Sequence, residues 1–249
     1  MRTRLIVGNW KMHGDLRDNE SRIHALIQND SCSDLVKRVI CVPFPYLAQS
    51  KRLLAGSTIG LGAQNLSTAE FGPFTGEVSA RMLHDFECRF VIVGHSERRI
   101  LLKEEDADVT KKVKIAINQS ITPIVCVGES LNERKLNKTE IRIRDQVDAI
   151  ISSLNSDEIA KMVFAYEPIW AIGTGETASP AQAQEIHCLI RSEIAQVSAD
   201  VAELIPILYG GSVKSTNAEA LFSMPDIDGG LVGGASLDAK EFNSICACA

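Results

Sequence analysis

A glutamate stands at an unusual place in this chain, between a run of apolar residues and a proline. Residues 162–166 read Met-Val-Phe-Ala-Tyr, and Glu167 and Pro168 follow directly. Partial shielding from water by Ile169 and Trp170 is expected to raise the pKa of this carboxyl, which would make it a better base for removing a carbon-bound proton. The alternative for Glu167 is a structural salt bridge.

Four other polar residues follow apolar runs in the same way. They are Asn9 and Lys11 near the N-terminus, and His95 and Glu97 near the middle of the chain. His95 is open to several roles: general acid or base, electrophile, metal ligand or structural group. A metal site needs further ligands, and His95 with Glu97 offers no third at helical or strand spacing. A helix is expected to follow, with Ser96 as its cap, and its N-terminal potential favours a neutral His95 ring.

A glycine-rich segment, Ala-Ile-Gly-Thr-Gly-Glu-Thr-Ala, occupies residues 171–178. Its spacing matches the dinucleotide fingerprint G-x-G-x-x-A, but residues 167–172 separate its first glycine from the preceding strand. Small residues around an apolar tip suit a hinged lid that closes over a ligand and excludes water. We therefore expect a lid here.

Glycine pairs follow the last two apolar runs, at residues 210–211 and 233–234. Paired glycines let backbone N–H groups approach a ligand closely. In closed α/β barrels the turns after strands seven and eight, with a short extra helix, commonly hold a phosphate. Either pair alone would indicate only a tight turn, whereas both together favour a phosphate site.

Eight short runs rich in β-branched residues must position these groups. The expected strands span 5–9, 38–42, 59–64, 90–94, 123–127, 162–166, 206–209 and 230–232, and the clearest helices span 106–119, 140–154 and 180–197. The last helix has Ser179 as its N-cap and Pro180 at its first position. Apolar strands alternating with amphipathic helices are typical of a buried parallel sheet. The pattern predicts an α/β fold, a single-domain (β/α)8 barrel over residues 1–249, with its active site at the C-terminal ends of the strands.

The composition restricts the class of protein. A net charge of −6 argues against a nucleic-acid-binding surface, although backbone amides can bind a small anion at any net charge. No apolar stretch approaches the roughly 20 residues of a membrane helix, and the N-terminal run is too short for a signal peptide. The seven cysteines lack the spacing of a disulfide framework or zinc site. We expect free thiols, no metal and a cytoplasmic location.

Taken together, these motifs resemble the triosephosphate isomerase family from one end of the chain to the other. Seven segments carry the resemblance, at residues 8–14, 63–65, 74–77, 94–99, 165–175, 209–213 and 232–237. Any one of them could arise by chance, but seven in this order are highly specific. The resemblance implies a TIM barrel that interconverts dihydroxyacetone phosphate and D-glyceraldehyde 3-phosphate, in glycolysis and gluconeogenesis, without a cofactor.

The resemblance also implies a role for each matched residue. Glu167 would move a proton between two substrate carbons, and a neutral His95 would stabilise the enediolate. Lys11 would supply positive charge near the phosphate and the reacting oxygens, Asn9 would help to place the substrate, and Glu97 would support the site. The phosphate would be held by the backbone around Gly173, Ser212, Gly233 and Gly234.

A homodimer is implied by residues 74–77, Phe-Thr-Gly-Glu. In the family, the loop carrying Thr75 reaches into the neighbouring subunit's site and touches the position of Asn9. Two residues depart from the family pattern. His13 replaces an asparagine near the subunit contact and would make dimerisation sensitive to pH. Glu176 replaces a lysine at the end of the lid and would alter only the timing of its motion.

Two other functions fit parts of the pattern. Another phosphate-binding barrel, such as an epimerase or a lyase of the tryptophan or pentose pathways, would lack the combination of Lys11, His95 and Glu167. A non-catalytic phosphate-binding barrel with an adhesion or interaction role would be expected to have lost one of these side chains, and none is lost. The sequence thus favours an aldose–ketose isomerase.

Overall fold

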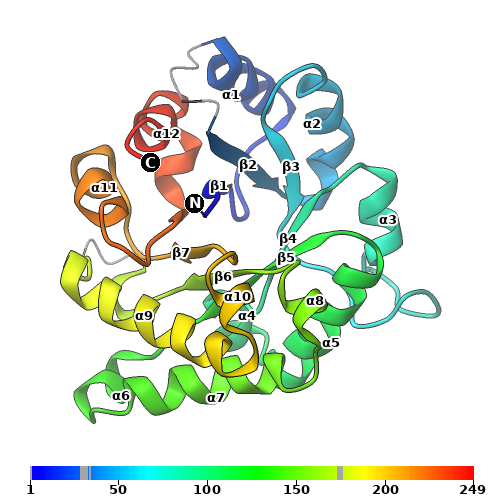
Figure 1. Cartoon of the computed structure of the whole chain (residues 1–249). Coiled ribbons are helices and arrows are strands. Elements are labelled where there is room, and N and C mark those ends of the chain that lie inside the picture. The colour runs from blue at the N-terminus through cyan, green and yellow to red at the C-terminus, as the bar shows by residue number, and fades with distance from the viewer. Residues whose placement is uncertain (1, 29–32, 34, 173–175) are drawn as a thin grey trace.

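Eight parallel strands close into a barrel in the order in which they occur along the chain (Figure 1). The computed structural model describes residues 2–28, 33, 35–172 and 176–249. The strands are β1 (Arg4–Asn9), β2 (Val36–Val42), β3 (Gly60–Ala63), β4 (Phe90–Val93), β5 (Thr122–Val127), β6 (Val163–Tyr166), β7 (Ile207–Tyr209) and β8 (Gly229–Val232). All eight expected strands are found, and the predicted (β/α)8 barrel is confirmed.

Helices surround the barrel on the outside (Figure 1). The α-helices are α1 (Leu16–Gln28), α2 (Leu47–Leu53), α3 (Ala80–Asp85), α4 (Ser96–Leu101), α5 (Asp106–Asn118), α6 (Leu131–Lys135), α7 (Thr139–Ile151), α8 (Ser156–Ile159), α9 (Pro180–Val197), α10 (Ala199–Ala202), α11 (Ser215–Phe222) and α12 (Ala239–Cys246). Three short 3-10 helices are η1 (Phe44–Tyr46), η2 (Ile169–Ala171) and η3 (Gly234–Leu237). The three helices predicted from periodicity correspond to α5, α7 and α9. The Ser179 hydroxyl caps α9 by accepting the Gln182 N–H, as expected.

Alternate residues of each strand face opposite sides of the barrel wall. On β6, Ala165 belongs to the apolar cluster inside the barrel, whereas Phe164 and Tyr166 pack in the layer between strands and helices. Glu167 continues this alternation and therefore turns back toward the barrel mouth. The pleat of β6 thus places the carboxylate inside and an aromatic ring behind it.

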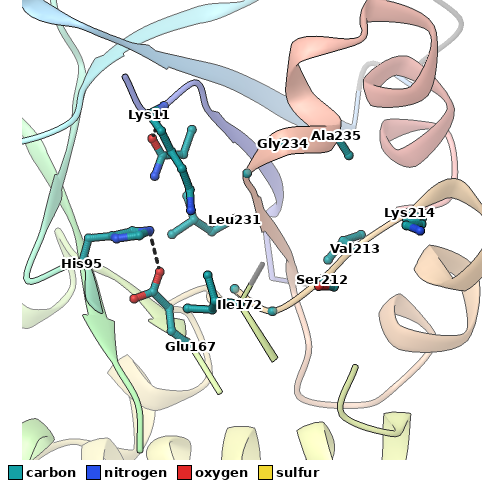
Figure 2. A pocket seen from close by; sticks show the side chains of 14 residues that line it. Lys11, His95, Glu167, Ile172, Ser212, Val213, Lys214, Leu231, Gly234 and Ala235 are labelled. Atoms are coloured by element: carbon teal, nitrogen blue, oxygen red, sulfur yellow. Dashed lines mark hydrogen bonds and ion pairs between the residues drawn. The ribbon is translucent and has the colours of Figure 1, made fainter. Parts of the chain in front are cut away.

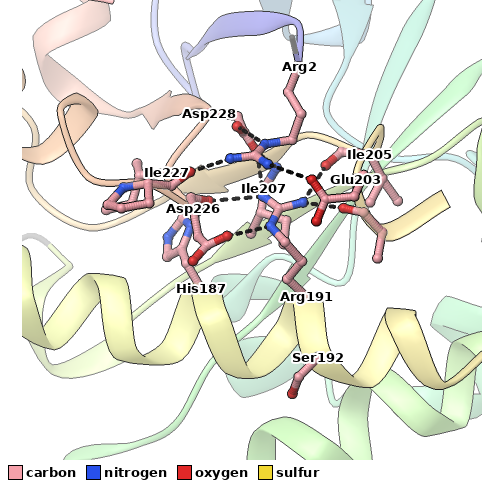
Figure 3. A network of polar contacts seen from close by, with 12 residues as sticks. Arg2, His187, Arg191, Ser192, Glu203, Ile205, Ile207, Asp226, Ile227 and Asp228 are labelled. Carbon is pink, nitrogen blue, oxygen red and sulfur yellow. Dashed lines mark hydrogen bonds and ion pairs between the residues drawn. The ribbon is translucent and has the colours of Figure 1, made fainter. Parts of the chain in front are cut away.

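A partly buried network of ionic contacts joins α9 to the residues just before β8 (Figure 3). The Arg191 guanidinium donates from Nε to Asp226 at 2.6 Å and from Nη2 to Asp228 at 2.7 Å. Arg2 donates to the other oxygen of Asp228, also at 2.7 Å. Because a buried charge is costly without partners, these contacts stabilise the packing of α9 on the barrel wall only as a complete set.

His187 lies one turn before Arg191 on α9 and is fully buried. Its Nδ1 is 3.2 Å from the Asp226 carbonyl oxygen, and because that oxygen can only accept, Nδ1 carries the ring proton. Burial lowers the pKa of His187 from its ordinary 6.5 to about 3. The ring is therefore neutral at any pH near 7.

The neutral His187 predicts how stability depends on pH. As pH falls from 6.5 toward 3, the unfolded chain binds a proton that the folded ring excludes, so the free energy of unfolding decreases. Between pH 7 and pH 5 the expected decrease is about 2 kcal/mol. Urea unfolding at both pH values should show this decrease for the wild type and for His24→Gln, which changes an exposed histidine, but not for His187→Phe. An equal decrease in His187→Phe would contradict the assignment.

Candidate active site

A cavity of about 290 Å³ opens at the C-terminal ends of the strands (Figure 2). Its lining brings together groups from β1, β4, β6, β7 and β8. The lining residues are Asn9, Lys11, His95, Glu167, Ile172, Gly210, Gly211, Ser212, Val213, Lys214, Leu231, Gly233, Gly234 and Ala235. All predicted site residues in the described part of the chain are in this list except Glu97, which lines an adjoining groove.

The Glu167 carboxylate is only 2% exposed and has two hydrogen-bond donors. His95 Nε2 lies 3.0 Å from Oε1, and the Ser96 N–H donates to Oε2 at 2.9 Å. Burial raises the pKa of Glu167, but the His95 ring and the Ser96 N–H outweigh burial and hold it below its ordinary value. The expected raised pKa is therefore wrong for this state of the site, in which the carboxylate is charged.

The apolar side chains beside Glu167 also differ from those expected from the sequence. The Trp170 side chain points away from the carboxylate, because its Nε1 donates to Glu129 at 2.9 Å, and Arg134 lies over its ring. Ile172 is the apolar side chain that lines the cavity beside Glu167. The alternative for Glu167, a structural salt bridge, has His95 as its partner among the described residues, and that contact is an ion pair only when the ring is protonated.

His95 is the N-cap of α4, whereas Ser96, the expected cap, is the first residue of the helix. The ring's Nδ1 accepts the Glu97 N–H at 3.2 Å, so this nitrogen carries no proton and Nε2–H faces Glu167. Burial lowers the pKa of His95, but the Glu167 and Glu97 carboxylates outweigh burial and raise it. The Glu97 N–H opposes protonation, because a second ring proton would break this hydrogen bond. The cap geometry therefore holds the neutral tautomer with its donor toward the cavity.

Lys11 has a left-handed backbone, with φ at 51°, which is strained for a residue with a side chain. Two hydrogen bonds hold it there. Its N–H donates to Asn9 Oδ1 at 3.0 Å, and its carbonyl oxygen accepts from Gln64 Nε2 at 2.8 Å. The ammonium group pairs with Glu97 and lies beside Gly233. Asn9 and Glu97 thus position Lys11 in this structure, and sequence reasoning did not identify Gln64.

Glycines surround Glu167 because nothing larger fits. A Cβ on Gly128 would lie 1.8 Å from the Glu167 carbonyl oxygen, and one on Gly210 would lie 2.8 Å from its Cγ. A Cβ on Gly211 would lie 2.3 Å from the Tyr209 hydroxyl. The glycine pair after β7 therefore allows close packing against the carboxylate, besides leaving its backbone open to a ligand.

Ser212 and Gly234 lie across the cavity from the His95–Glu167 pair (Figure 2), and Gly233 lines the same cavity. Gly233 and Gly234 stand at the start of η3, the short extra helix expected here. Lys214, an exposed cation on the same side, was not foreseen. Gly173, the other predicted phosphate residue, lies outside the described residues, as does the middle of the predicted lid.

Both ends of the predicted lid segment are tied to the barrel. The Ser212 hydroxyl donates to the Ala171 carbonyl oxygen at 2.9 Å, and the Ala178 N–H donates to the Tyr209 hydroxyl at 3.1 Å. These contacts link the segment to the end of β7 and to the turn that follows it, which also borders Glu167.

A cysteine thiol lies beside the His95–Glu167 pair. Cys126 is buried beside the site, and burial together with Glu167 raises the pKa of its thiol well above the ordinary value, so it is protonated. The six cysteines in the described residues form no disulfide.

Within the described ranges, no His, Cys, Asp or Glu side chains gather in a group that could hold a metal ion. No helix in those ranges is long and apolar enough to cross a membrane.

Comparison with known proteins agrees with this geometry. A family model described as triosephosphate isomerase matches residues 4–249. Proteins named triosephosphate isomerase are similar over the full length: 52% identity in Nitrosococcus oceani, covering all of both chains, and 53% in Thiobacillus denitrificans, covering all of this chain and 99% of the relative. The protein of that name from Nitrosomonas europaea is 52% identical, with coverage of 100% and 98%. The chain therefore belongs to the triosephosphate isomerase family.

Proposed function

We propose that this chain interconverts dihydroxyacetone phosphate and D-glyceraldehyde 3-phosphate by moving a proton between C1 and C2. The observation that carries the proposal is a buried, charged carboxylate beside a neutral imidazole donor in a cavity that also holds an ammonium group. Enolisation needs these three groups: a base for the carbon-bound proton, and a donor and a positive charge for the oxyanion that forms.

The pKa of Glu167 explains how the resting pair becomes reactive. In the resting site His95 and the Ser96 N–H lower this pKa, while burial acts in the opposite direction. When the carboxylate leaves these donors to reach a substrate carbon, the lowering contacts are lost and burial remains. Glu167 is thus charged before substrate binds and becomes a stronger base in contact with the substrate.

His95 and Lys11 then face the enediolate. The Nε2–H released by Glu167 is free to donate to the substrate oxygens, and Lys11 adds positive charge. Protonated Glu167 returns its proton to the neighbouring carbon, and the proton of the C1 hydroxyl passes to the oxygen on C2. Atoms and electrons therefore balance within the substrate, and the step needs no redox group. The phosphate would rest on the backbone around Ser212, Gly233, Gly234 and Gly173, with Lys214 nearby.

We also propose a cellular role for this reaction. We assign the reaction to glycolysis and gluconeogenesis in the cytoplasm, carried out by one domain over residues 1–249. A non-catalytic binding barrel gains no support, because Lys11, His95 and Glu167 all line one cavity.

The base assignment predicts the effect of Glu167→Gln. Glutamine keeps the size of the side chain but cannot take a proton, so kcat should fall by at least ~10²-fold. The measurement is a coupled assay with glyceraldehyde 3-phosphate, and Glu185→Gln, which changes an exposed glutamate on α9, should retain wild-type rates. Equal rates for wild type and Glu167→Gln would contradict the base assignment.

We also propose that the chain forms a homodimer through the loop carrying Thr75. A groove of about 320 Å³ adjoins the active site and is bordered by Asn9, Lys11, His95 and Glu97. Large apolar side chains beside it are unusually exposed: Met12 at 94%, Leu101 at 73% and Leu102 at 62%. Such a patch is typical of an interaction surface. The exposed loop of a second copy, with Phe74 and Thr75, has the apolar and small polar groups to fill it.

Phe74→Asp should therefore weaken self-association, because it would place a charge in an apolar contact. Sedimentation velocity at micromolar concentration should show a dimer for the wild type and a larger share of monomer for the variant. Leu204→Asp, at an exposed leucine that does not line the groove, serves as the control. A monomeric wild type, or an unaltered dimer in Phe74→Asp, would contradict the assigned contact.

A further inference from the structure

Three aromatic rings pack together directly behind the strand ends that carry the active site. Tyr166 and Tyr209 are register partners on β6 and β7, with ring centroids 6.4 Å apart. His187, reaching in from α9, contacts both, with centroids 6.0 Å from Tyr166 and 6.5 Å from Tyr209. All three side chains are fully buried.

The residues that follow these two tyrosines face the cavity. Glu167 follows Tyr166, and Gly210 follows Tyr209. The Gly210 N–H donates to the Tyr166 carbonyl oxygen at 2.7 Å, and the Glu167 N–H donates to the Val127 carbonyl oxygen at 2.7 Å. With so little space between Gly210 and the Glu167 side chain, a shift of either strand end would move the carboxylate.

The His187 ring is itself held in place from behind (Figure 3). Its Nδ1–H donates to the Asp226 carbonyl oxygen, and Asp226 is fixed by Arg191 and by Gln184, whose Nε2 donates to its carboxylate at 2.6 Å. The ring is thus in contact with the α9 network on one side and with the two tyrosines on the other.

We propose that His187 is a positioning residue for Glu167. Its neutral ring fills the space behind Tyr166 and Tyr209 and so sets where the ends of β6 and β7 place the carboxylate. This role rests on the proposed isomerase function. It requires the aromatic ring of His187, whereas the hydrogen bond to Asp226 is secondary, because the Asp226 carbonyl oxygen also accepts from Arg191 Nη2 at 3.2 Å.

Two substitutions separate the ring from its hydrogen bond. His187→Gln removes the ring and keeps a donor, and kcat should fall roughly 10-fold with KM within about threefold, since misplacing a reacting group by 1 Å can cost about 10²-fold. His187→Phe keeps a ring and should restore kcat to within about threefold of wild type. If His187→Gln fails to fold, His187→Leu, which fills much of the space without a ring, takes its place.

The decisive readout is the same substitution in a Glu167→Gln background. A glutamine at residue 167 cannot take a proton, so its exact position no longer affects the rate. His187→Gln should therefore change the residual kcat of Glu167→Gln by less than about twofold. A merely structural role would lower kcat by the same factor in both backgrounds, and that result would overturn the proposal. Loss of activity in His187→Phe equal to that in His187→Gln would also overturn it.

These outcomes distinguish this proposal from the proposed function. A wild-type chain without isomerase activity would refute the function and this role together. Wild-type activity with equal losses in the two backgrounds would refute only the role of His187.

Discussion

A charged carboxylate at 2% exposure persists only where donors replace the water that it has lost, and Glu167 has two such donors, His95 Nε2 and the Ser96 N–H. Both come from the end of β4 and the start of α4, while the carboxylate comes from the end of β6. The closed barrel must therefore hold the ends of β4 and β6 close together at its mouth. This structure holds Glu167 in its charged form, and in the proposed reaction the carboxylate leaves these two donors to reach the substrate.

Much of the surrounding structure serves this one contact. Gly128 and Gly210 leave room for the backbone and side chain of Glu167, and the cap geometry of His95 fixes which ring nitrogen faces it. Behind the strands, the tyrosine rings and His187 fill the layer next to α9. Both proposals for His187, the positioning of Glu167 and the loss of stability in acid, rest on the same buried, neutral ring.

The sequence predicted the fold because apolar strands and amphipathic helices have different periods, and Ser179-Pro180 marked the start of α9 correctly. The sequence also predicted that Asn9, Lys11, His95 and Glu167 would lie close together, because the carboxyl ends of parallel strands meet at one edge of the sheet. Features set by distant contacts were missed. The lowered pKa of Glu167 depends on His95, 72 positions earlier in the sequence. The His187 and Arg191 contacts join α9 to residues 226–228, and no local pattern indicates them.

The central claim is that Glu167 removes a proton from one substrate carbon and returns it to the next. Turnover of dihydroxyacetone phosphate in D2O, with trapping and NMR of the product, tests this most directly. A proton held on a carboxylate exchanges with solvent, so glyceraldehyde 3-phosphate formed in D2O should carry deuterium at C2. Product formed at the normal rate without any deuterium at C2 would indicate direct hydride transfer between the carbons and would contradict this account.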